Sequence, residues 1–156
     1  MPSTRPIKLD DWGISWEEYK ELTYFCLQYE QKKRDAAALL TIRLSTPVPE
    51  TYRRGGKEYG TFMPRGSGRI SDPVAATAAK RDRLLRDVHM IEQAVAAACD
   101  GAGEGMYSAL LKAVTTRSGV QAVYANPDTR PPRNEKQFYQ LRRRFFWILR
   151  EMRNEN

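Results

Sequence analysis

Basic side chains gather near the end of the chain and suggest its chemistry. Residues 130–156 hold eight basic and three acidic residues, so this segment carries a net charge of +5 out of +7 for the whole sequence. Concentrated positive charge is typical of proteins that bind a polyanion, because each phosphate that is neutralised releases a counterion. We therefore expect nucleic acid, and duplex DNA in particular, as the partner.

The spacing within this segment predicts a helix with two faces. At about 100° per residue, one face collects large apolar side chains. These are Phe138, Leu141, Phe145, Ile148, Leu149 and Met152. Lys136, Gln140 and Arg143 project from the opposite face, as in a recognition helix, where glutamine pairs with adenine and arginine or lysine with guanine. Trp147 also falls on the polar face, which predicts a contact with another subunit or another part of the chain.

The full set of expected DNA contacts extends beyond this polar stripe to its neighbours. It consists of Arg130, Arg133, Lys136, Gln137, Tyr139, Gln140, Arg142, Arg143, Arg144 and Arg150. In this set we expect the later arginines to hold phosphates, while the residues of the first two helical turns reach base edges.

A second basic segment, residues 45–71, is rich in glycine and proline. Such a composition buries too little apolar surface to offset the entropy of ordering the chain, so we predict a long, mobile loop. A loop that contacts polyanion and an inert, solvated connector are both consistent with this composition. The expected polyanion contacts are Arg53, Arg54, Lys57, Arg65 and Arg69.

No arrangement of residue types in the sequence indicates catalysis. We find no nucleophile with an adjacent base and no metal-binding cluster, and we predict a non-enzymatic protein without a cofactor or metal. The only histidine, His89, is interpreted as a surface or seam residue. Asp82, Asp87 and Glu92 alternate with arginines along a predicted helix, which is typical of a solvent face with salt bridges.

Helix signals predict an all-α fold. Ser15 and Glu18 form a capping box before a helix expected at about 16–43, and an Asp-Pro pair begins a second helix at about 73–99. Shorter helices are expected at about 104–116 and 118–125, and Asn134 caps a final helix at 134–153. We therefore predict two long helices (residues 1–100) joined by the flexible basic loop, followed by a three-helix unit like a helix-turn-helix (101–156).

Composition and the second long helix indicate the class and assembly of the protein. With 156 residues, 41% hydrophobic and 29% charged, the chain fits one soluble domain without a signal peptide or membrane span. Cys26 and Cys99 lie in apolar helical patterns, where cysteine is a small buried hydrophobe, so we expect a reducing cytoplasm. A heptad-like seam from Leu84 to Ala98 predicts a homodimer, with a monomer as the alternative.

Four stretches, 72–75, 83–93, 107–115 and 138–147, resemble small proteins of Gram-positive phages and mobile elements. The sequence is similar there to late-gene transcription activators of the RinA and ArpU kind, over roughly residues 14–40 and 70–150. The resemblance implies an all-α protein of the bacterial host cytoplasm with a sigma-region-like helix-turn-helix that binds promoter DNA. It also implies that the recognition helix corresponds to residues 137–144.

Two other classes of function are consistent with the same residues. One is a small inhibitor or adaptor, of the anti-CRISPR type for example, that uses its basic surfaces to bind a host nucleoprotein or its nucleic acid. The other is a phage packaging or assembly component that oligomerises through its long helices.

Overall fold

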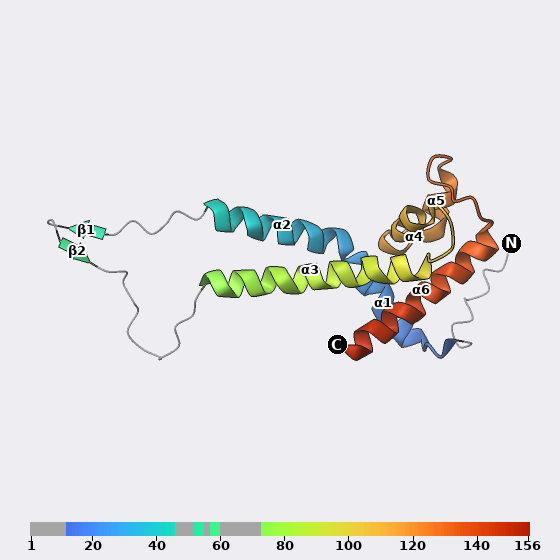
Figure 1. Ribbon diagram of the computed structural model, residues 1–156, viewed down its shortest axis with the longest axis horizontal. Coiled ribbons are helices and arrows are strands. Elements are labelled where there is room, and N and C mark those ends of the chain that lie inside the picture. The colour runs from blue at the N-terminus through green and yellow to red at the C-terminus, as the bar shows by residue number, and fades with distance from the viewer. Residues whose placement is uncertain (1–11, 46–51, 55–56, 60–72) are drawn as a thin grey trace.

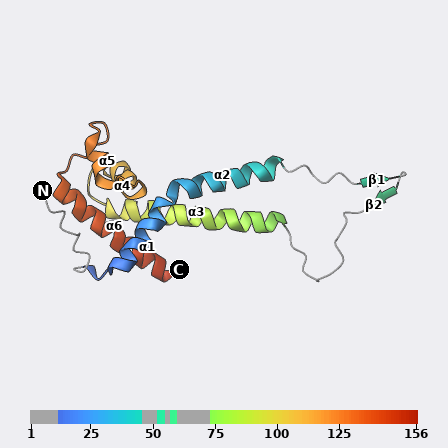
Figure 2. The same cartoon turned by 180° about the vertical axis from the view of Figure 1, so that it is seen from behind.

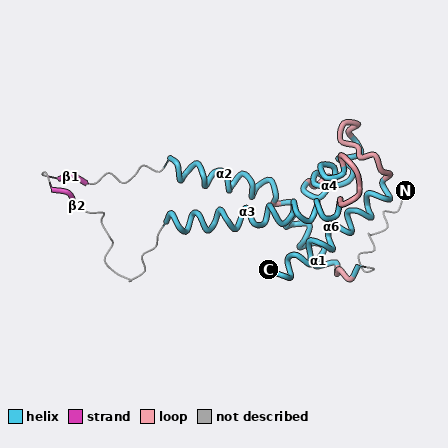
Figure 3. Tube along the Cα trace, in the orientation of Figure 1, coloured by secondary structure: helices cyan, strands magenta, loops and turns pink. Residues whose placement is uncertain are grey.

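The computed structural model describes residues 12–45, 52–54, 57–59 and 73–156, and this part of the chain is essentially all helical (Figures 1 and 3). The predicted all-α class is confirmed. The helices are α1 (Trp16–Leu27), α2 (Tyr29–Ser45), α3 (Pro73–Ala98), α4 (Met106–Thr115), α5 (Gly119–Ala125) and α6 (Glu135–Glu155).

The first predicted helix is divided at Gln28 into α1 and α2. Its start is confirmed, since Ser15 and Glu18 form the reciprocal capping box, with N–O distances of 2.9 and 3.2 Å. No proline or glycine marks the break. The two parts instead have different partners: α1 packs against α4 and α6, whereas α2 packs along α3. Tertiary packing therefore sets this boundary.

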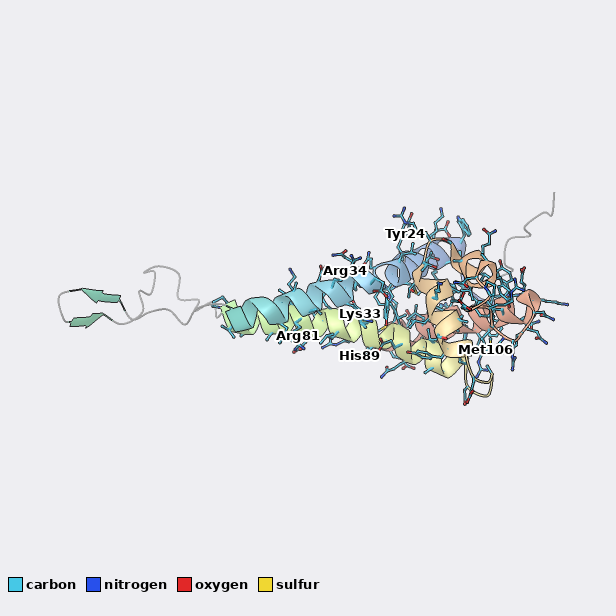
Figure 4. The ribbon with its side chains drawn as sticks, turned by 90° about the horizontal axis from the view of Figure 1, so that it is seen from above. Tyr24, Lys33, Arg34, Arg81, His89 and Met106 are labelled. Carbon is cyan, nitrogen blue, oxygen red and sulfur yellow. The ribbon has the colours of Figure 1, made fainter. Side chains whose placement is uncertain are left out.

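Helices α2 and α3 lie side by side in opposite directions and extend away from the other helices (Figures 1 and 2). Two polar contacts join them: the Tyr29 hydroxyl donates to Glu92 at 2.6 Å, and Lys32 Nζ lies 2.7 Å from Asp87 Oδ2. These two carboxylates therefore bind the neighbouring helix instead of forming the predicted solvent face. His89 is exposed on α3, as expected (Figure 4).

The core lies where α3 meets the shorter helices. The seam of α3 is confirmed as apolar core, because Val88, Ile91, Val95 and Ala98 are buried there. Within one chain, α2 and α6 pack against α3. The homodimer expected from this seam stays a prediction.

Two short strands interrupt the segment that was expected to be a loop. Strands β1 (Tyr52–Arg54) and β2 (Lys57–Tyr59) pair antiparallel, with Tyr52 opposite Tyr59. Gly55 and Gly56 stand between them in the sequence, and such a pair is a strong signal for a tight hairpin. The remainder of 46–72 lies outside the described residues, as do Arg65 and Arg69. For Arg53, Arg54 and Lys57 only the backbone is described.

The long turn between α5 and α6 is tied to the helix that precedes it. The Tyr124 hydroxyl donates to the carbonyl oxygen of Arg133 at 2.7 Å, and Thr129 Oγ1 donates to the Val123 carbonyl at 2.9 Å. Arg130 donates from Nη2 and Nε to the Tyr124 carbonyl at 2.9 and 3.3 Å. These bonds tie the connection between α5 and α6 to the end of α5.

Candidate nucleic-acid interface

Helix α6 is held rigidly by its apolar face. Asn134 begins the helix by accepting the Gln137 backbone N–H at 2.9 Å. Phe138, Phe145 and Leu149 are fully buried, and α6 packs against α3, α1 and α4. The predicted apolar face is thus confirmed, and the opposite side of the helix is fixed toward solvent.

The outward side chains of α6 line an open groove of about 480 Å³. Its lining residues are Trp12, Arg133, Gln137, Gln140, Leu141, Arg143 and Arg144. Five of the expected DNA contacts are brought together here, and no carboxylate is among the described residues that line the groove. The arrangement offers guanidinium groups for anions and amides that both donate and accept hydrogen bonds.

The groove also contains Trp12, which the sequence reasoning did not identify. Gly13 turns the chain in the left-handed region, at φ 67°, and Ile14 anchors the segment by complete burial. The Trp12 ring thereby reaches Trp147 of α6, with centroids 6.3 Å apart. One of the two contacts predicted for Trp147, with another part of the chain, is therefore present. A lone tryptophan before a helix cap gave no periodic signal that would have revealed it.

Arg142 belongs to the protein interior more than to the groove. Its Nη2 donates to the Tyr19 hydroxyl at 2.9 Å, and its guanidinium carbon lies 5.8 and 5.2 Å from the ring centroids of Tyr19 and Phe146. Phe146 is buried as well, so the apolar face of α6 is wider than the predicted set. Because its guanidinium is engaged within the fold, Arg142 is poorly placed to hold a phosphate.

Arg150 and Arg130 are also absent from the groove lining. Arg150 Nε lies 3.4 Å from Glu18 Oε1. The pKa of the Glu18 carboxyl is lowered, mainly by the backbone hydrogen bond at Ser15 and then by the charge of Arg150. Arg130 is bound to the end of α5, as described above.

The two remaining expected contacts lie beside the groove. Lys136 is exposed in the first turn of α6, whereas Tyr139 is half-buried and packs against the core. The carbonyl oxygen of Tyr139 accepts a hydrogen bond from Arg143 Nε at 3.3 Å, which restrains the guanidinium of Arg143. The predicted stripe is therefore present on the surface, with Gln140 and Arg143 in the groove and Lys136 outside its lining.

The two cysteines lie in the core or pack against it. Burial raises the pKa of the Cys26 thiol to about 12, in keeping with its predicted role as a buried hydrophobe, while Cys99 is half-buried. Among the described residues, no cluster of His, Cys, Asp and Glu side chains is placed to hold a metal ion. None of the described helices combines the length and apolarity needed to cross a membrane.

No family model matches the sequence, and neither a curated protein nor a solved structure shows significant similarity to it.

Proposed function

We propose that this chain is a non-enzymatic DNA-binding regulator of the phage or mobile-element type, which reads duplex DNA with the first half of α6. One observation carries the proposal: Arg133, Arg143 and Arg144 meet two glutamines in a single groove, and the described residues that line it include no carboxylate. The positive charge of the arginines would attract any of three anionic ligands: free phosphate, nucleic acid or an acidic protein. The glutamines favour nucleic acid, because their amides match base edges.

The fold supports a division of roles among these residues. Gln137 and Gln140 are exposed on adjoining turns of a helix whose other side is buried, so their amides are presented from a rigid element. We assign them to base edges and the three arginines to phosphates. The resemblance to late-gene activators points to the same helix.

Salt dependence is the first experiment. For a DNA sequence selected from a random pool, the logarithm of the binding constant should fall linearly with the logarithm of the salt concentration. Arg144→Ala should weaken binding to all sequences alike and reduce the magnitude of the slope by about 0.9, the contribution of one phosphate contact. Gln140→Ala should cost about 1–3 kcal/mol at particular base pairs.

Arg86→Ala is the matched control, since it removes an exposed arginine from α3 outside the groove. It should leave the slope close to the wild-type value. Affinity that does not change with salt would contradict the proposal. If Gln140→Ala lost equal affinity for selected and random DNA, Gln140 would not contact base edges.

A further inference from the structure

An exposed pair of tryptophans lies beside the basic groove. Trp12 and Trp147 remain 38% and 40% exposed although their rings contact one another at an interplanar angle of 56°. Leaving such large apolar rings in water is unfavourable, and clustered exposed aromatics commonly mark a binding surface. Trp12 itself lines the groove, together with the arginines and glutamines described above.

The surroundings of Trp12 define the class of ligand. Positive charge that follows a phosphate backbone, combined with an aromatic ring on which a base stacks, is the usual chemistry of single-stranded nucleic-acid sites. In continuous duplex each base face is covered by the neighbouring base pair. An indole can therefore stack only on a base that is unpaired or turned out of the helix.

We propose that Trp12 stacks on an unpaired nucleotide adjoining the duplex that α6 reads, with Arg144 on a flanking phosphate. The inference rests on the proposed function, because the same groove supplies both contacts. It adds that the preferred ligand is DNA with a locally opened segment, such as a bubble or a junction between single and double strands.

The position of Trp12 favours this geometry. Gly13 and the buried Ile14 attach the ring directly to the edge of the groove, and Trp147 supports it from α6. The ring thus shares one groove with Gln140 and Arg144. A base that leaves the duplex at this edge meets an aromatic face and a hydrogen-bonding amide together.

Fluorescence anisotropy with the full chain tests the inference on three labelled DNAs of one sequence: a duplex, the same duplex with a short unpaired bubble, and a single strand. The bubble should bind at least about fivefold more tightly than the duplex, the lower range for one stacked base. Trp12→Ala should abolish this gain, while Trp12→Phe should keep most of it because an aromatic face remains.

Trp16→Ala provides the control, since Trp16 is 56% exposed and is not a lining residue of the groove. It should retain the full gain, and circular dichroism should show that all variants are folded. Equal affinity for bubble and duplex, or a gain that survives Trp12→Ala, overturns the inference and leaves the proposed function standing. Binding to the bubble and the single strand without duplex binding rejects the proposed function, and with it the adjoining duplex that the inference requires. Failure to bind any of the three DNAs overturns both.

Discussion

Three consecutive arginines of α6 have the same charge and different surroundings. Arg142 turns inward and binds the Tyr19 hydroxyl at 2.9 Å, whereas Arg143 and Arg144 line the groove. Successive residues of a helix point about 100° apart, so neighbouring arginines of one run can face different surroundings. The net charge of the segment consequently overstates the charge that a partner meets, and the role of each arginine depends on what its side chain contacts.

The largest expected difference in the free energy of unfolding is between two uncharged residues in the same turn of α6, one on its inner face and one on its outer face. Phe138 is fully buried and makes an edge-to-face contact with Tyr124 at 5.7 Å. Phe138→Ala should lower the free energy of unfolding by about 3–5 kcal/mol, measured by urea denaturation. Gln137→Ala, on the exposed side, should change it by less than about 0.5 kcal/mol. Similar losses from both variants would mean that α6 is not oriented as described.

Replacing the inward and the outward arginines of α6 should give an intermediate difference in the free energy of unfolding. Arg142→Ala removes a hydrogen bond and two contacts with aromatic rings, so it should destabilise the fold by about 1–3 kcal/mol. Arg144→Ala should leave stability within about 0.5 kcal/mol of wild type while weakening DNA binding. Urea denaturation and anisotropy on the same preparations separate the two effects. If Arg142→Ala weakened DNA binding without loss of stability, the inward placement of Arg142 would be wrong.

Arg150 represents a third situation, an arginine bound at the surface, and its effect should be the smallest. The pKa of its partner Glu18 is lowered in the folded protein below the ordinary value of 4.5, mainly by the backbone hydrogen bond from Ser15 and then by the charge of Arg150. Protonation therefore favours the unfolded state: the contribution of Glu18 is present above pH 4.5 and is lost as pH falls through the lower folded pKa. In Glu18→Gln the thermal midpoint should fall less on acidification than in wild type.

Glu17→Gln is the control for this pH series, because Glu17 lies in the same first turn and the capping box uses Glu18. Its thermal midpoint should follow the wild-type pH dependence. If the thermal midpoints of Glu18→Gln and wild type depended on pH identically, Glu18 would not contribute to the loss of stability in acid.

The sequence predicted those features that depend on local interactions. The start of α1 follows from the capping box at Ser15, and the apolar face of α6 follows from spacing, because both arise within one helix. The break at Gln28 cannot be predicted from local sequence, since it reflects the different partners of α1 and α2. The inward turn of Arg142 likewise requires Tyr19, which is distant in sequence and is brought near only by the fold.

For the candidate site, the sequence identified the charged and amide side chains and missed the aromatic one. Gln140 and Arg143 are recognisable because they repeat at helical spacing. Trp12 precedes the first cap and belongs to no repeat, so only the folded chain places it beside α6. The two strands near Gly55 have a local signal in the glycine pair, but the glycine- and proline-rich composition of the whole segment predicts a loop.

The left-handed turn at Gly13 has a consequence for how quickly a ligand is captured. A side chain at this position would be strained at φ 67°, so the conformation depends on glycine. Because the turn is fixed in the folded protein, the conformational freedom of Trp12 and Gly13 is lost during folding and not during association. The association rate should then be governed by diffusion and by long-range attraction between opposite charges, with no slow rearrangement at Trp12.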